Sequence, residues 1–130
     1  MRYLTSEQIL LIHSIVIDET GGSHGLRDRN GLQSAVGLPQ QTFDGTELYA
    51  SPFAKAAVYA RSIIASHPFV DGNKRTGMVA ASVFLENNGY RIIAERGEIE
   101  RCALRIVRDK LSVDAIAVWF QEHTTKRSTL

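Results

Sequence analysis

Apolar residues recur every three or four positions along most of this chain, the spacing that places them on one face of an α-helix. Polar, proline and glycine breaks separate these stretches and divide the chain into consecutive elements. The pattern predicts helices at about residues 5–20, 30–36, 51–66, 74–88, 97–110 and 112–123. We therefore expect an all-α fold, a compact helical domain spanning residues 1–123.

Several of these helices carry clear start and stop signals. Thr5 and Gln8 have the form of a capping box, in which each side chain bonds the backbone N–H of the other residue. Ser51 followed by Pro52 is typical of an N-cap and the first helical residue. Pro68 ends the third helix, because proline disfavours helical geometry in the residue before it.

The helix expected at residues 74–88 is apolar nearly all round. Its apolar residues are Met78, Val79, Ala80, Ala81, Val83, Phe84 and Leu85. A helix with so little polar surface is typical of the centre of a domain. We expect it to be a central, buried helix.

Three segments lack the helical spacing. Residues 40–50 contain the turn dipeptide Asp44-Gly45 and predict a loop or a small hairpin. Residues 90–93 are long enough only for an extended link or an edge strand. Residues 124–130 form a polar tail, which we expect to be disordered.

Composition narrows the class of protein. A chain of 130 residues is long enough for one domain with a real core. Fifteen Lys and Arg against 14 Asp and Glu exclude the broad basic face that direct nucleic-acid binding uses. No apolar stretch approaches the ~20 residues of a membrane span, and no leader is visible. The single Cys102 excludes a disulfide within the chain and fits a cytoplasmic protein.

The segment between the third and fourth expected helices, residues 67–77, gathers most of the chemically capable side chains. His67 can take up a proton near neutral pH. Asp71 is a hard oxygen ligand of the kind that Mg²⁺ prefers. Gly72 permits a close approach to the backbone, and the Asn73 amide can cap the following helix.

Lys74 and Arg75 place two positive charges on the first turn of that helix. The helix dipole already makes this end positive, so the two cations are unfavourable for the helix alone. A bound anion removes the conflict, because the free N–H groups and both side chains can hold a phosphate. We therefore predict a phosphate cradle with a candidate base, His67, and a candidate metal ligand, Asp71, beside it.

Two other interpretations fit parts of this segment. A loop between buried helices can carry a structural histidine and a turn aspartate, and either residue alone favours that interpretation. A Walker A phosphate loop has glycines at the spacing of Gly72 and Gly77, but Met78 stands where it requires a lysine. The combined spacing of the acid, base and cations favours a functional site.

The order of residues in this segment resembles the signature of the Fic/Doc superfamily. The matching residues are His67, Phe69, Asp71, Gly72, Asn73 and Arg75. Lys74 and Met78 depart from the usual Fic pattern, which has Gly and Arg there, and both departures resemble the death-on-curing (Doc) toxin branch. Supporting similarity lies at residues 24–28, 39–43 and 87–90.

The resemblance implies a compact helical fold that binds ATP with Mg²⁺. It implies that His67 is the catalytic base, that Asp71 holds the metal, and that Phe69 anchors the loop. The implied phosphate-binding residues are Gly72, Asn73, Lys74 and Arg75. It further implies that the segment Thr42, Phe43 and Asp44 is a flap that docks the target protein by strand addition.

The Doc branch implies a protein kinase that phosphorylates a hydroxyl of elongation factor Tu and so arrests translation. It also implies a Phd-like antitoxin as partner. Lys74 offers a physical reason for phosphate transfer, since its side chain fills the space of an α-phosphate and favours a reversed nucleotide. A Fic-like adenylyltransferase and a catalytically silent interaction module are the alternatives. The intact His67, Asp71 and Asn73 argue against the silent module.

The remaining histidines carry weaker signals. His13 and His123 have no spaced partner, so we interpret both as surface or packing residues. His24 follows two glycines, and its sequence leaves open whether it borders the site. Cys102, on an amphipathic helix, is interpreted as a core residue.

Overall fold

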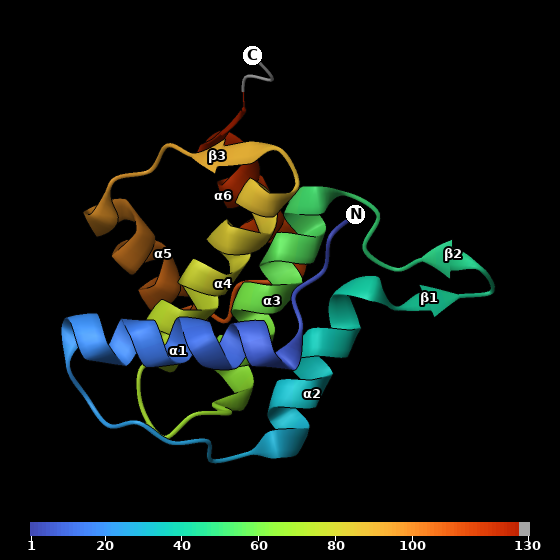
Figure 1. Cartoon of the computed structure of the whole chain (residues 1–130). Helices are drawn as coiled ribbons and strands as arrows, with labels where there is room; N and C mark the ends of the chain where they lie inside the picture. The colour runs from blue at the N-terminus through green and yellow to red at the C-terminus, as the bar shows by residue number, and fades with distance from the viewer. Residues whose placement is uncertain (128–130) are drawn as a thin grey trace.

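A computed structural model describes residues 1–127 of the chain, and most of these residues are helical (Figure 1). The α-helices are α1 (Ser6–Thr20), α2 (Arg29–Gly37), α3 (Pro52–Ser66), α4 (Asn73–Asn87), α5 (Arg96–Arg108) and α6 (Val113–Glu122). A short 3₁₀ helix follows α2 at Leu38–Gln40, and short strands lie at Thr42–Phe43 (β1), Thr46–Glu47 (β2), Tyr90–Ile92 (β3) and Thr124–Lys126 (β4). The all-α prediction is confirmed, with helix bounds within two residues of those expected.

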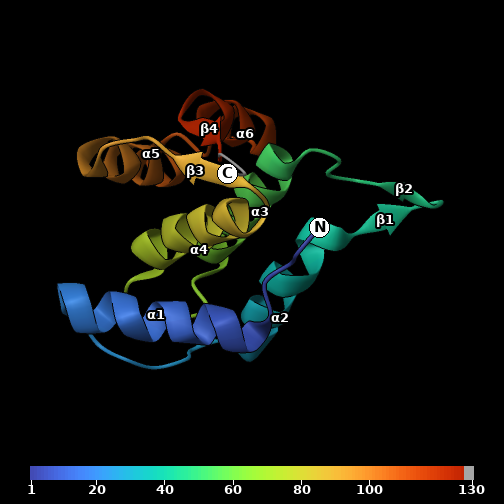
Figure 2. The ribbon, with the colours of Figure 1, turned by 45° about the horizontal axis from the view of Figure 1, so that its top comes forward.

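Helices α3 and α4 pack against each other in the middle of the molecule (Figure 2). Helices α1 and α2 cover one side of this pair, and α5 and α6 cover the other. The largest fully buried apolar side chains come from all three layers, and they include Ile9, Tyr59, Ile63, Phe84, Leu85 and Phe120. The expected central helix is confirmed, although α3 shares the central position with α4.

The predicted helix-start signals also appear in the structure. The Thr5 hydroxyl accepts a hydrogen bond from the Gln8 backbone N–H, and the Gln8 side chain accepts one from the Thr5 N–H. The Ser51 side chain accepts from the Ala54 N–H, with Pro52 as the first residue of α3. These local bonds fix where α1 and α3 begin, and so fix which residues of each helix face the core.

Residues 42–47 form the predicted hairpin. Thr42 pairs with Glu47, and Phe43 pairs with Thr46, around a two-residue turn. Asp44 and Gly45 both have positive φ, 50° and 78°, as the tight turn of a two-residue hairpin requires. All six residues are exposed, and Phe43 keeps 70% of its surface in solvent.

A buried lysine holds the root of this hairpin. Lys55, in the first turn of α3, is 1% exposed, and its ammonium donates to the carboxylate of Glu47 at 3.0 Å. It also donates to the backbone oxygens of Tyr49, at 2.5 Å, and Pro39, at 3.3 Å. An ammonium carries three protons, so these bonds satisfy the buried charge and tie residues 39–49 to α3.

The C-terminal tail differs from the prediction. Residues Thr124–Lys126 form strand β4, antiparallel to β3, with Tyr90 opposite Lys126. The backbone N–H of Arg127 also donates to the oxygen of Gly89 at 2.8 Å. Because residues 90–92 offer an unpaired strand edge, even a polar segment gains backbone hydrogen bonds by pairing there. The ordered domain therefore extends past residue 123, and residues 128–130 lie outside the described residues.

Cys102 is buried, as predicted, and burial raises the pKa of its thiol to about 11. A thiol with so high a pKa is protonated at neutral pH and is a poor nucleophile. Within residues 1–127, none of the helices combines the length and the apolar character that crossing a membrane requires.

Candidate functional site

The segment that carries the motif joins the C-terminal end of α3 to the N-terminal end of α4. His67 is the residue that ends α3, and its backbone is left-handed, with φ 49° and ψ 59°. This conformation costs a residue with a Cβ atom about 1 kcal/mol, so its surroundings must hold it in place. The turn at His67 leaves its side chain exposed and directs the chain into the connection.

Phe69 anchors the middle of this connection. Its side chain is 1% exposed, and its ring stacks on His13 of α1 with centroids 3.9 Å apart and planes within 5°. The Nε2 atom of His13 lies 2.8 Å from the backbone oxygen of Asp71. Because a carbonyl oxygen only accepts, Nε2 carries the hydrogen in this arrangement. His13 is therefore a packing residue, as interpreted from the sequence, and it contacts the motif twice.

Asn73 does not cap α4 as the sequence suggested. Its side-chain oxygen accepts from the Phe69 N–H at 3.0 Å, and its side-chain nitrogen donates to the Phe69 oxygen at 2.9 Å. The N-cap of α4 is Gly72, with φ 76°, and no side chain of residues 1–127 caps this end. The Asn73 amide thus closes the loop on itself, which leaves the first N–H groups of α4 available to an anion.

The carboxylate of Asp71 is held by backbone N–H groups. One oxygen accepts from Gly72 at 2.9 Å, and the other accepts from Ser23 at 3.1 Å. Gly22 lies so close that a Cβ atom there would sit 2.6 Å from the carboxylate. The glycine-rich segment after α1 therefore wraps around Asp71 and sets the direction of its side chain.

A cleft of about 770 Å³ opens beside the start of α4. Its walls come from α1, α4 and α5, and the residues Asp71, Gly72, Asn73, Lys74 and Arg75 lie at one end of it. The rest of the lining combines the apolar residues Val16, Met78, Val79, Ile99, Ala103 and Leu104 with the polar residues Glu19, Thr20, Arg96 and Glu100. This combination of an apolar wall and a polar end suits a ligand with a flat ring and phosphates.

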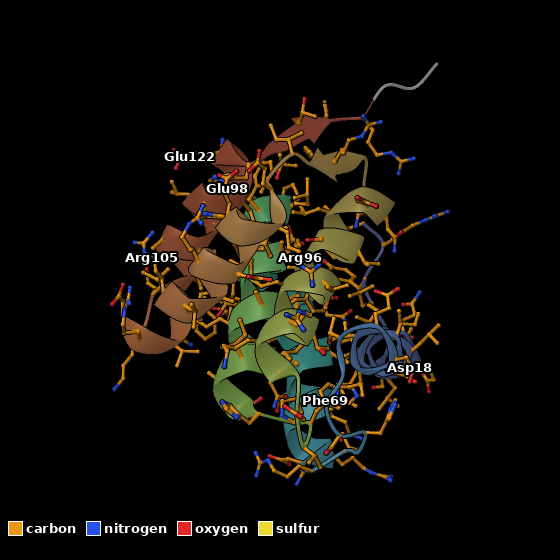
Figure 3. All side chains as sticks on the ribbon, turned by 90° about the vertical axis from the view of Figure 1, so that its left-hand side faces the viewer. Asp18, Phe69, Arg96, Glu98, Arg105 and Glu122 are labelled. Atoms are coloured by element: carbon orange, nitrogen blue, oxygen red, sulfur yellow. The ribbon has the colours of Figure 1, made fainter. Side chains whose placement is uncertain are left out.

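Figure 3 views the molecule with α1 end-on, with Phe69 in the α3–α4 connection and Arg96 at the start of α5. The carboxylate of Glu100, one turn after Arg96, lies 3.4 Å from that guanidinium and 3.8 Å from that of Arg75. All three side chains are substantially exposed, so these ion pairs are weak and exchange readily for a stronger anion. A phosphate at the start of α4 can therefore compete with Glu100 for Arg75.

The site fits Mg²⁺ held together with phosphates better than a metal held by protein alone. In the described part of the chain, no three His, Cys, Asp or Glu side chains gather to form a metal cage. Asp71 offers one oriented, exposed carboxylate at the end of the cleft. Mg²⁺ is commonly bound through one or two carboxylates, waters and substrate phosphates, which this arrangement accommodates.

The structure brings together only part of the predicted site. Residues 71–75 share the end of the cleft, and His67 is at the end of α3, outside the residues that line it. The hairpin with Thr42, Phe43 and Asp44 precedes the other end of α3, a 15-residue helix about 22 Å long. Figure 1 accordingly shows β1 and β2 projecting on the side away from the α3–α4 connection.

Several residues that contact this region were not predicted from the sequence. His13 and Gly22 are described above, Arg27 bonds the end of α3, and Glu100 faces Arg75. A signal existed for His13, because it falls on the same helix face as Ile9, Ile12 and Val16, where a polar residue is unusual. No local pattern pointed to Glu100, because α5 and α4 are brought together only by tertiary packing.

The other two histidines lie in different surroundings. His24 bonds the Asp18 carboxylate at 2.9 Å in the exposed segment next to Asp71, with its ring 6.4 Å from that of His13. His123 stacks on Trp119 and lies 3.0 Å from the Glu98 carboxylate. His24 thus borders the candidate site, and His123 links α6 to α5.

Comparison with known proteins agrees with this geometry. The family model described as Fic/DOC matches residues 3–85, which include the whole motif segment. The chain therefore belongs to the Fic/DOC family.

Two named relatives narrow this assignment to the Doc branch. The protein named Toxin Doc, from Mycolicibacterium smegmatis, is 40% identical over 93 residues, which cover 72% of this chain and 69% of that protein. The protein named Protein kinase doc, from Escherichia phage P1, is 26% identical over 117 residues, 90% of this chain and 91% of that one.

Proposed function

We propose that this protein is a toxin that transfers the γ-phosphate of ATP to a hydroxyl group of a translation factor. The observation that carries the proposal is the uncapped start of α4, where Lys74 and Arg75 stand at one end of the cleft. The phage relative is named as a protein kinase, and the mycobacterial relative is named as a toxin. Elongation factor Tu is the target that the Doc resemblance favours.

Phosphates fit the polar end of the cleft for three physical reasons. The helix dipole is positive there, and the first N–H groups of α4 carry no side-chain cap. Lys74 and Arg75 add two full charges on the same turn. Gly72 begins α4 with φ 76°, a conformation that glycine adopts without strain, and so keeps the first N–H groups of the helix in place. Mg²⁺ at Asp71 would supply further neutralisation of phosphate charge.

His67 is the candidate base in this proposal. Its exposed imidazole, in neutral form, accepts the proton of the target hydroxyl as that oxygen attacks the γ-phosphorus. The bond between the γ-phosphorus and the bridging oxygen breaks, and ADP leaves with the electron pair. Positioning and charge stabilisation supply most of the rate in such reactions, which agrees with the rigid anchoring of residues 67–73.

The direct test is mass spectrometry of purified elongation factor Tu after incubation with the protein, ATP and Mg²⁺. The proposal expects the gain of one phosphate with the wild type and none with His67→Ala. Growth arrest on expression should disappear with the same substitution. A His67→Ala variant that still modifies the target would refute the assignment of the base.

The same experiment separates phosphorylation from adenylyl transfer, because a gain of AMP would show the alternative reaction. Lys74→Ala tests the role of Lys74 in directing the nucleotide. We expect slower phosphate transfer or a switch of product with Lys74→Ala, whereas Lys126→Ala, an exposed lysine in β4, serves as the matched control. Equal rates and products for both variants would count against the role of Lys74.

The toxin proposal also includes a small Phd-like antitoxin as partner. The M. smegmatis relative is named as a toxin, and the Doc resemblance implies an antitoxin encoded beside it. Co-expression of the neighbouring short reading frame should restore growth and allow the two proteins to be purified together. Arrest that persists with every neighbouring frame would contradict this part of the proposal.

A further inference from the structure

The five residues 24–28 run beside the motif connection like a short extra strand. The N–H of Val70 donates to the oxygen of Gly25 at 3.0 Å, and the N–H of Arg27 donates to the oxygen of Pro68 at 2.7 Å. Leu26 and Phe69 form an isolated antiparallel bridge between these bonds. The backbone of Arg27 is therefore fixed directly opposite the residue that follows His67.

The side chain of Arg27 continues this contact onto the end of α3. Its Nε atom donates to the backbone oxygen of His67 at 2.7 Å, and its Nη2 atom donates to that of Ser66 at 2.8 Å. The last carbonyls of a helix lack partners and carry the negative end of the dipole. A guanidinium fork matches two such oxygens, and a lysine, with a single point charge, does not reproduce this geometry.

The charge of Arg27 is not used elsewhere in the described residues. No carboxylate of residues 1–127 lies within salt-bridge distance of it. The carboxylate of the neighbouring Asp28 accepts from the Gly31 N–H at 3.1 Å and caps α2. Both side-chain bonds of Arg27 thus go to the turn where His67 adopts its left-handed backbone.

We propose that Arg27 is a positioning residue for His67: its guanidinium locks the left-handed turn that aims the imidazole at the target hydroxyl. This inference rests on the proposed function of His67 as the base. Arg27 is not among the residues that line the cleft, and its side-chain hydrogen bonds go to the backbone oxygens of residues 66 and 67.

A positioning role for Arg27 predicts a change in kcat without a change in the affinity for ATP. Nucleotide binding depends on the start of α4, which Arg27 does not contact, so the affinity for ATP should stay unchanged in its variants. Transfer depends on the aim of His67, so kcat should fall on the order of 10- to 100-fold, as small misplacements of catalytic groups do. A residue that only stabilised the fold would leave kcat per folded molecule unchanged.

The experiment compares Arg27→Lys and Arg27→Gln with the wild type. Arg29→Gln is the matched control, since Arg29 is an exposed arginine two residues further on. Phosphate transfer to elongation factor Tu gives kcat, titration with ATP gives the affinity, and circular dichroism confirms the folded fraction. We expect both Arg27 variants to lose kcat with unchanged ATP affinity, and Arg29→Gln to match the wild type. Unchanged kcat in both Arg27 variants would overturn the proposal.

A second readout does not depend on the reaction. The ¹³Cα and ¹³Cβ chemical shifts of His67 report its backbone conformation, and they should move away from left-handed values in Arg27→Gln but not in Arg29→Gln. If the wild type transfers no phosphate, the proposed function fails and the chemical shifts alone decide. His67 shifts identical to those of the wild type would then refute the positioning role.

Discussion

The two hydrogen bonds between Asn73 and the backbone of Phe69 allow a quantitative prediction. Substitution Asn73→Ala removes both bonds and leaves the N–H and the oxygen of Phe69 without partners. Phe69 is 1% exposed and Asn73 is 7% exposed, so water does not readily replace the lost amide.

The magnitude follows from the number of groups left unpaired. A buried backbone group without a partner costs about 1–2 kcal/mol, so the pair costs about 2–4 kcal/mol. The better helix propensity of alanine returns about 0.5 kcal/mol. We expect the free energy of unfolding to fall by about 1.5–3.5 kcal/mol, a large part of the 5–15 kcal/mol typical of a domain.

Equilibrium unfolding in urea, followed by the fluorescence of the single Trp119, measures this change. Trp119 lies in α6, away from the start of α4, so it reports global unfolding and not the local change. Asn87→Ala is the control, because Asn87 is an exposed asparagine at the other end of α4. A loss below 0.5 kcal/mol in Asn73→Ala, or one equal to that of the control, would refute the reasoning.

Three further predictions concern other contacts. Gly22→Ala should lower thermal stability by about 1–3 kcal/mol more than Gly21→Ala. Both glycines have positive φ, but only a Cβ at Gly22 would meet Asp71, at 2.6 Å. Equal losses in thermal unfolding would show that this contact is unimportant. Thr76→Val should keep stability or raise it by up to about 1 kcal/mol in urea unfolding, since the buried Thr76 hydroxyl has no hydrogen-bond partner in residues 1–127. A clear loss of stability would show that this hydroxyl is hydrogen-bonded. The Glu95 N–H, and then His123, hold the pKa of the Glu98 carboxyl below its ordinary 4.5, so the stability that Glu98 contributes is present above pH 4.5 and is lost as the pH falls through the lowered pKa. The Tm difference between wild type and Glu98→Gln should therefore shrink from near pH 7 to near pH 3, and a constant difference would contradict this.

Features that depend on local chemistry were predictable from the sequence. The capping box at Thr5, the proline start of α3 at Pro52 and the Asp44-Gly45 turn each arise from neighbouring residues, and the structure has all three. The placement of residues 71–75 together along the cleft was predictable for the same reason, since these residues are neighbours in the sequence at the start of one helix.

Features that depend on distant partners were not predictable. Strand β4 forms because Tyr90 to Ile92 offer an edge more than 30 residues earlier in the chain, and nothing within residues 124–126 signals it. Asn73 had two chemically reasonable uses, capping α4 or bonding the loop, and only the position of Phe69 decides between them. The distance between the hairpin and the motif is likewise set by the length and direction of α3.

The anchors of the motif connection come from the N-terminal part of the chain, up to 58 residues away from what they hold. Closing so long a loop costs chain entropy that only the assembled core repays, so residues 67–73 gain their geometry together with the whole domain. A substitution that unfolds the domain should therefore also abolish the proposed toxicity. Under the proposed function, selection for cells that survive expression of this protein should return core substitutions, in Ile9 or Phe84 for example, as readily as substitutions of His67.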